Sequence, residues 1–390
     1  MRTLQDGIYY DHGERPGAAF GIAFLRAGAE ATAADVGTLL HRLWDLWQGL
    51  GRGEVPGLPD ATVPPGGLTT LVGYGVKVYD LPGAGHPVPQ GQGEAARFRS
   101  PLPQGGGPLL RGAGLRYAPD VTANAATEDV VVQWVADTEL AVHRALVETA
   151  REITRARDAA TGEAPLELAA FYRGSGRDDG RSWIGFHDGV SNLRSGAERA
   201  GVVTIEPDNA PLPADAWTVG GTYLAFIRLS VDLDVWDGID RRTQELLVGR
   251  DKVTGSPLVA VGPDGTPEPH AGCPVAGTET VLDPGNETFR EPPPVTDPAL
   301  LASHVQRANQ HREPATAPNS LRVYRQGYEY LETSGTSVSV GLNFVSFQDS
   351  LSRLLRSLTQ PGWLGGTNFG GTPPASPELL GVRAAAVFLV

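Results

Sequence analysis

Residues 321–347, LRVYRQGYEYLETSGTSVSVGLNFVSF, decide the fold. Two stretches rich in β-branched and aromatic residues, Leu321 to Tyr330 and Ser337 to Phe347, predict two consecutive strands. With the elements around them they give the second half of the chain the order β-α-β-β-α-β. The elements around them are a strand at Thr222 to Leu229, a helix from about Asp234 to Gly249, a helix from about Ser350 to Leu358, and a terminal strand at Ala386 to Val390.

The first half of the chain predicts the same order. Its first strand alternates, with Phe20, Ile22 and Phe24 on one side. The repeated order predicts an α+β fold of two ferredoxin-like units, residues 1–180 and 181–390, each with an antiparallel sheet and helices on one face. The elements are a strand at 18–26, a helix over Val36 to Trp47, a strand around Leu71 to Tyr79, a strand at Val130 to Val135, a helix from about Asp137 to Arg157, and a strand at Leu168 to Tyr172.

An insertion from about residue 250 to 320 interrupts the second unit between its first helix and the next strand. It is rich in proline and glycine and contains His304 and His311. A segment this long inside a compact unit is usually functional or disordered. Within it, 297–309 has a helical stripe that includes Leu300, His304 and Ala308, and this stripe favours a functional role.

Composition excludes several classes of protein. Among the 390 residues, 45 Asp and Glu outnumber 32 Lys and Arg, so the net charge of −13 argues against nucleic acid as a partner. The single cysteine, Cys273, allows no intramolecular disulfide. No stretch approaches the roughly 20 apolar residues of a membrane span, and no signal peptide is evident. We therefore expect a cytoplasmic protein without a membrane partner, and a homo-oligomer stays open.

One group of residues with chemical potential is Gly185 to Asn192, GFHDGVSN. Glycines before and after Asp188 allow the backbone to approach a flat ligand closely and hold the carboxylate at a tight turn. The alternative is an ordinary Asp-Gly turn, which is common in proteins.

Two further groups are centred on His304 and Arg325. His304 lies on the apolar stripe of its helix, where it could bind iron or be an ordinary core histidine. Arg325 lies in a strand, where an arginine usually faces solvent. The eight histidines form no H-E-x-x-H pair and no Cys/His zinc spacing, so a zinc site is not indicated.

Together these three groups resemble the dye-decolourising peroxidase family. In that family a G-x-x-D-G motif, an H-x-x-R-x-N segment and an arginine before a Gly-Leu-x-Phe strand follow one another in this order. The resemblance covers nearly the whole chain. It implies a haem b pocket mainly in the C-terminal unit, with the insertion contributing to it. The residues that it implies are Asp188 and Arg325 as catalytic residues, His304 as the proximal iron ligand, Arg307 and His311 beside the haem propionates, and Gly189, Val190, Asn192 and Phe344 as further cofactor contacts.

The resemblance also implies an activity. Hydrogen peroxide would be cleaved heterolytically with the help of Asp188 and Arg325 to give a ferryl intermediate, which oxidises a small aromatic electron donor such as a dye or phenol. Alternatives are a haem carrier, a haem-free protein on the same scaffold, and a deferrochelatase-like protein that releases iron from haem. One departure is that Asn319 and Ser320 stand where relatives often have an acidic partner of the proximal histidine; Glu313 or a backbone carbonyl could replace it.

Overall fold

The computed structural model describes residues 4–8, 17–89, 129–193, 196–210, 212–269, 294–308, 320–358 and 379–390. His311, Glu313, Asn319 and Cys273 lie outside these ranges. No helix in these ranges has both the length and the apolar content needed to cross a membrane.

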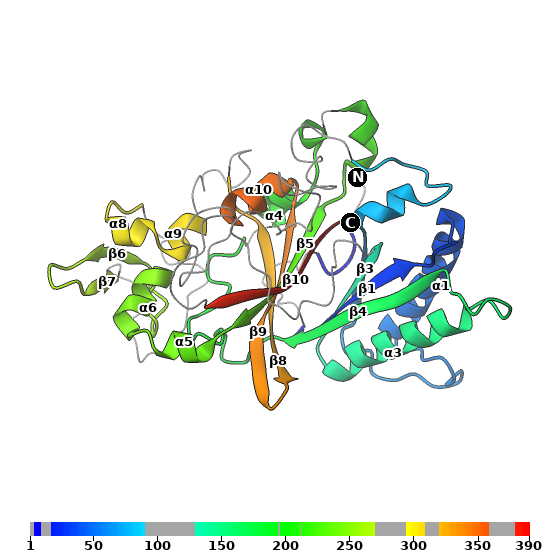
Figure 1. Cartoon of the computed structure of the whole chain (residues 1–390), viewed down its shortest axis with the longest axis horizontal. Helices are drawn as coiled ribbons and strands as arrows, with labels where there is room; N and C mark the ends of the chain where they lie inside the picture. The colour runs from blue at the N-terminus through cyan, green and yellow to red at the C-terminus, as the bar shows by residue number, and fades with distance from the viewer. Residues whose placement is uncertain are drawn as a thin grey trace.

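The described strands form a large antiparallel sheet in which the two halves of the chain have equivalent strand orders (Figure 1). The first half is ordered β4-β1-β3-β2, and the second half is ordered β10-β5-β9-β8. The strands are β1 (Ala19–Ala27), β2 (Thr69–Tyr74), β3 (Val130–Ala136), β4 (Leu166–Ser175), β5 (Tyr223–Val231), β8 (Tyr324–Ser334), β9 (Ser337–Gln348) and β10 (Leu380–Leu389). A separate two-stranded sheet pairs β6 (Leu258–Val261) with β7 (Pro267–Pro269).

The sequence predicted a separate sheet in each half. Within the described residues, the two halves instead close into one barrel of eight strands. Each of the two seams is a single residue pair. Leu389 of β10 pairs with Tyr74 of β2, and Ser175 of β4 pairs with Glu329 of β8. Such short contacts leave no pattern in the sequence, so the closure could not be predicted.

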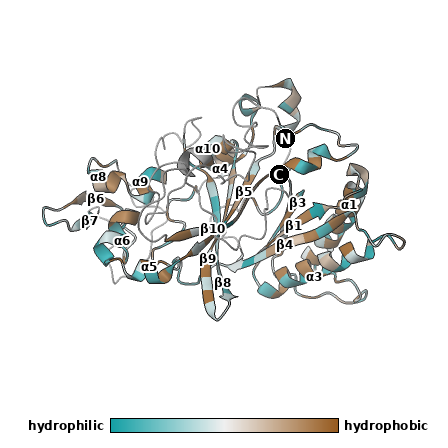
Figure 2. Cartoon of the chain, in the orientation of Figure 1, coloured by the Kyte–Doolittle hydropathy of each residue, from teal (hydrophilic) through white to brown (hydrophobic). Residues whose placement is uncertain are grey.

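Helices cover the outside of the closed sheet (Figure 1). Thr32 and Thr138 cap the two long helices of the first half, α1 and α3, and the Thr32 cap is a complete capping box with Asp35. Along α3, hydrophilic and hydrophobic residues alternate, as expected for a helix with one face on a sheet (Figure 2). The helices are α1 (Ala33–Gly51), α3 (Glu139–Arg155), α4 (Gly196–Val203), α5 (Leu233–Asp237), α6 (Arg241–Val248), α8 (Pro298–Leu301), α9 (His304–Ala308) and α10 (Leu351–Leu358).

The interior of the closed sheet is a shared aromatic core. Phe20 and Phe24 of the first half contact residues of the second half, and Phe20 stacks on Tyr328 at a ring distance of 4.4 Å. A second core lies under α1 and α3, where Trp47 packs edge-on against Trp134. Residues on the outer face of the second half belong to a third core, which includes Ile227 and Leu354. This outer face also carries a cavity.

Two helices predicted as continuous are broken in the structure. The helix expected from Asp234 to Gly249 is divided into α5 and α6, because Asp240 caps a new start at the backbone N–H of Thr243. The segment expected as one helix, 297–309, is divided into α8 and α9. At that break the Ser303 hydroxyl accepts from the backbone N–H of Gln306, so that α9 begins at His304.

Candidate active site

A tight hairpin between residues 180 and 188 holds Asp188. The backbone N–H of Gly185 donates to the Ser182 carbonyl at 2.8 Å, and the N–H of Ser182 donates to the Phe186 carbonyl at 2.9 Å. At the base of the hairpin the N–H of Asp188 donates to the Gly180 carbonyl at 3.0 Å. The position of Asp188 is therefore determined by backbone hydrogen bonds on its N-terminal side.

Asp188 and Gly189 also form the ordinary Asp-Gly turn that the sequence analysis gave as the alternative interpretation. The backbone N–H of Gly189 donates to Asp188 Oδ1 at 2.7 Å, and Gly189 has φ of +71°. This backbone conformation favours glycine. The turn leaves the Asp188 side chain exposed at the cavity, so the turn and the functional interpretation apply to the same residue.

Strand β8 presents Arg325, Gly327 and Glu329 to the same cavity. Residues two apart share a face of a strand, so these three positions follow one another along one face. A Cβ atom at Gly327 would lie 3.2 Å from Asp188 Oδ2 and 3.3 Å from Leu342 Cδ1. The missing side chain at Gly327 thus makes room for the Asp188 carboxylate between Arg325 and Glu329.

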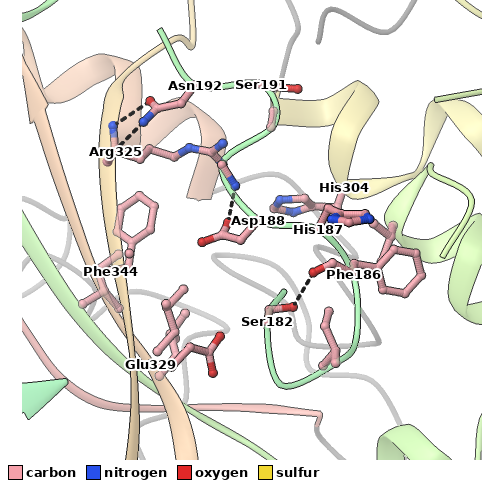
Figure 3. A pocket seen from close by; sticks show the side chains of 18 of the residues that line it. Ser182, Phe186, His187, Asp188, Ser191, Asn192, His304, Arg325, Glu329 and Phe344 are labelled. Carbon is pink, nitrogen blue, oxygen red and sulfur yellow. Dashed lines mark hydrogen bonds between the residues drawn. The ribbon is translucent and has the colours of Figure 1, made fainter. Parts of the chain in front are cut away.

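Asn192 fixes the backbone of Arg325. Its Oδ1 accepts from the Arg325 N–H at 3.0 Å, and its Nδ2 donates to the Arg325 carbonyl at 2.7 Å. Figure 3 shows both bonds and the Arg325 side chain extending toward Asp188. Burial lowers the pKa of Arg325, whereas the nearby Asp188 carboxylate opposes this change. The guanidinium and carboxylate therefore form an electrostatic pair.

His304 reaches the cavity from the first position of α9. Gly249, in the left-handed region at φ of +88°, lets the end of α6 approach this helix, because a Cβ there would lie 2.5 Å from Ser303 Oγ. Burial, followed by the positive charges of Arg325 and Arg250, lowers the pKa of His304 to about 4. Near neutral pH the imidazole is therefore uncharged and can bind a metal through a nitrogen lone pair.

The cavity has a volume of about 280 Å³, and its walls are mostly apolar side chains of β5, β9, β10 and α10. It brings together six of the residues singled out in the sequence. Val190 and Arg307 do not line it, and His311 lies outside the described residues. The six are Asp188, Gly189, Asn192, His304, Arg325 and Phe344.

Two charged residues of the cavity were missed. Arg322 is 4% exposed and donates to the Ser191 carbonyl at 2.9 Å. Glu329 is 8% exposed, and its Oε1 accepts from the backbone N–H of Trp183 at 3.3 Å. Burial raises the pKa of Glu329 to about 8, and the negative charge of Asp188 adds to this. The alternation of strand residues was the available signal, because it puts Glu329, four residues after Arg325, on the same face of β8.

The cavity residues fit a haem better than a bare metal ion. No three His, Cys, Asp or Glu residues in the described ranges lie close enough to hold a metal ion. The cavity instead offers the neutral imidazole of His304 and aliphatic or aromatic walls such as Ile227, Leu229 and Phe344. One imidazole ligand within apolar walls is an arrangement typical of haem sites. His187 also lines the cavity, but its Nε2 lies 2.9 Å from Arg181 Nη2 and 3.2 Å from the Val253 carbonyl.

The family model described as "Dyp-type peroxidase, C-terminal" matches residues 179–362, the segment that carries Asp188, His304 and Arg325. This segment of the chain belongs to the DyP-type peroxidase family. This confirms the resemblance found in the sequence motifs.

Solved structures of DyP-type peroxidases have the same fold. The DyP-type peroxidase from Cellulomonas bogoriensis is 22% identical, with a TM-score of 0.62 over 96% of this chain and 89% of that one. Ferric DtpA from Streptomyces lividans is 19% identical, with a TM-score of 0.66 over 99% and 93% of the two chains. A variant of Rhodococcus jostii RHA1 DypB in complex with heme is 14% identical, with a TM-score of 0.59 over 100% and 96%.

Curated relatives of this chain carry a different functional name. Deferrochelatase from Escherichia coli strain K12 is 28% identical over 186 residues, which are 46% of this chain and 37% of the relative. Deferrochelatase from Shigella flexneri is 28% identical over 186 residues, which are 46% and 38% of the two chains. The match therefore spans less than half the length of either relative.

Proposed function

We propose that the chain is a haem b peroxidase that uses hydrogen peroxide to oxidise a small aromatic donor such as a dye or phenol. The observation that carries this proposal is that Asp188, His304 and Arg325, from three separate segments, line one cavity. Two structural relatives, ferric DtpA and the DypB variant in complex with heme, support haem as the cofactor.

In this proposal His304 binds the haem iron, while Ile227, Leu229 and Phe344 contact the porphyrin. Arg322 is a buried cation on the cavity wall and is suited to a haem propionate. Arg307 and His311 stay predictions as further propionate partners. The bound haem would supply the redox chemistry, and the protein side chains would supply proton transfer and charge stabilisation.

Asp188 is placed to act as a general base and acid. Its carboxylate would take the proton from one peroxide oxygen and return it to the other, which leaves as water. Arg325 would stabilise the negative charge that develops on the leaving oxygen, since a guanidinium remains charged and donates from fixed positions. Asn192 serves this step indirectly by holding the backbone of Arg325.

We further propose that residues 1–180 and 181–390 are two ferredoxin-like units, with the haem pocket in the second. The equivalent strand orders of the two halves support this, as does the cavity on the outer face of β5, β9 and β10. A cytoplasmic location stays a sequence-based prediction, and a homo-oligomer stays open.

A second candidate is a deferrochelatase-like activity, which would release iron and leave the porphyrin intact. The curated relatives with that name favour it. A haem carrier would use the same pocket without peroxide turnover. Incubating the haem-loaded protein with peroxide and a phenolic donor separates the three functions. A peroxidase consumes peroxide and oxidises the donor in many turnovers, a deferrochelatase yields free porphyrin, and a carrier does neither.

A further inference from the structure

Glu329 lies where the two halves of the closed sheet meet. Its backbone pairs with Ser175 of β4, which is the single residue pair of that seam. The side chain lines the cavity that contains Asp188, and it also lines a second cavity of about 440 Å³. Trp183 is the other residue common to both cavities. Glu329 therefore borders both cavities, and the second of them is lined by residues from both halves of the chain.

The second cavity has several charged or titratable residues in its wall. Glu139 and His143 of α3 line it, together with Arg173 of β4 and Arg177 just beyond that strand. His143 and Arg173 form a hydrogen bond at the surface, with 2.9 Å between His143 Nε2 and Arg173 Nη1. A cavity of this size with such polar groups in its wall can hold water. It can thus supply protons to a carboxyl in its wall.

The position of Glu329 suits a proton carrier. Oε1 accepts a single backbone hydrogen bond, and Oε2 has no hydrogen-bond partner among the described residues. An unpaired carboxylate oxygen in a buried site is costly, whereas a protonated carboxyl can donate to a water molecule. The raised pKa, about 8, has the same physical origin. Glu329 thus holds a proton near neutral pH that an ordinary glutamate would have lost.

The distance to Asp188 suits transfer through water. Asp188 Oδ2 lies against Gly327, and Glu329 follows two residues later on the same face of β8. Two residues span roughly 6.6 Å along a strand, so the Glu329 backbone lies one strand repeat beyond the position that Asp188 contacts, a spacing that one water molecule can bridge.

We infer that Glu329 carries protons from the second cavity to Asp188. This inference rests on the proposed peroxidase function. Reducing one hydrogen peroxide to two waters consumes two electrons and two protons, so protons must enter the cavity if the donor remains outside. In each transfer the O–H bond of Glu329 breaks and an O–H bond forms at Asp188 through the intervening water. Glu329 is then reprotonated from the second cavity, and no electron moves in this step.

Other charged groups around Glu329 affect its ionisation but leave its position between the cavities unchanged. Asp188 and Asp179 favour its protonated form, while Arg177 favours its ionised form. The charged or titratable groups that face it are Asp188 and Asp179 of the hairpin segment, Arg177 and Arg173 at the end of β4, Glu139 and His143 of α3, and Arg325 of its own strand.

The test compares haem-loaded wild type with Glu329→Gln, which has the same shape but cannot release a proton. Glu329→Asp is a second variant that keeps a carboxyl, and Glu167→Gln replaces an exposed glutamate of β4 as a control. Infrared spectra from about pH 5 to 10 follow the carbonyl band of protonated carboxyl groups. We expect a component that disappears near pH 8 in the wild type and in Glu167→Gln, and that is absent from Glu329→Gln.

The second readout is steady-state peroxide turnover with a phenolic donor over the same pH range. We expect Glu329→Gln to lower kcat by about tenfold or more with little change in KM, because general acid-base groups typically contribute more than this. Glu329→Asp should lose less, and a small weak acid in the buffer should partly rescue Glu329→Gln. Turnover of Glu329→Gln equal to wild type at every pH overturns the inference, as does a Glu329 carboxyl that ionises below about pH 6. An inactive wild type would instead overturn the proposed function, and the relay with it.

Discussion

The side-chain amide of Asn192 hydrogen-bonds both backbone polar groups of Arg325, at 3.0 Å to its N–H and 2.7 Å to its carbonyl. A neighbouring strand would normally make such a pair of bonds. At Arg325, near the start of β8, strand β9 lies on one side, and the Asn192 side chain takes the place of a strand on the other. The contact joins the segment that carries Asp188 to the strand that carries Arg325. The two side chains proposed to handle peroxide are therefore held in register by a third residue.

Asn192→Ala should consequently slow the reaction with peroxide while leaving haem bound. Loss of the amide frees the backbone of Arg325, and small displacements of a catalytic group are costly, so we expect a loss of about tenfold or more in rate. Stopped-flow absorbance of the haem-loaded variant measures it. Asn192→Asp keeps an acceptor for the Arg325 N–H, so its rate should lie between those of the wild type and Asn192→Ala. A rate equal to wild type in both variants would show that Arg325 needs no such support.

His304→Ala should abolish stable haem binding while the fold survives. His304 is the one described histidine that lines the cavity from the insertion, and its neutral imidazole is suited to the iron. The Soret absorbance at full haem loading is the measurement, with circular dichroism as the check on folding. His41→Ala, an exposed position on α1, is the control. If His304→Ala keeps the Soret band and His187→Ala loses it, the ligand is His187.

Arg325→Leu should slow the first reaction with peroxide more than Asp188→Asn does. Removing a charge-stabilising donor from a preorganised site commonly costs on the order of 100-fold. A general base can in part be replaced by water. Stopped-flow rates for both variants, compared from about pH 4 to 7, decide the order. A slower Asp188→Asn at every pH would reverse the roles, and two unaffected variants would place peroxide cleavage elsewhere.

Gly249→Ala should weaken haem binding from a position outside the cavity wall. The new methyl group would meet Ser303 Oγ at 2.5 Å and so displace the start of α9, where His304 lies. Gly57 has a φ of +86° with nothing within 4 Å of its Cβ position, so Gly57→Ala measures the backbone strain alone. We expect both variants to lose about 1–3 kcal/mol in unfolding free energy. A haem titration should show weaker binding only in Gly249→Ala, and equal affinities would exclude the coupling between Gly249 and His304.

Glu329 should make the unfolding free energy depend on pH. Its pKa is about 8 in the folded protein, compared with 4.5 for an ordinary glutamate, so the folded state binds the proton more tightly. The contribution to stability is therefore complete below about pH 4.5 and is lost as the pH rises to 8. In urea unfolding, the wild type should have a lower unfolding free energy at pH 8 than at pH 5. In Glu329→Gln this difference should be smaller by at least about 1 kcal/mol, the value of one pKa unit. Identical decreases in the two proteins would show that Glu329 ionises normally.

Much of the fold could be predicted from the sequence because alternation and helix caps act locally. The alternation of Phe20, Ile22 and Phe24 gave β1, and the apolar stripe from Val36 to Trp47 gave α1. Helix breaks at Asp240 and Ser303 were missed, although both residue types favour helix starts. The closure of the sheet depends on the single pairs Leu389–Tyr74 and Ser175–Glu329, which only the folded chain brings together.

The candidate site was predictable where it follows family motifs and less so elsewhere. Asp188, His304 and Arg325 stand in such motifs, and the structure brings them to one cavity. Arg307 was expected beside the cofactor but does not line the cavity, because His304 and Ala308, one helical turn apart, occupy that face of α9. Glu329 was missed because its importance comes from burial between two cavities, which residue type alone does not reveal.

The most direct test of the central claim, that one cavity binds haem through His304 and cleaves peroxide, is the absorption spectrum of the haem-loaded protein before and after one equivalent of hydrogen peroxide. We expect a Soret band that shifts and weakens on mixing and returns when a phenolic donor is added, with no release of porphyrin. A Soret band that does not respond to peroxide, or one that is replaced by the spectrum of iron-free porphyrin, would contradict the account.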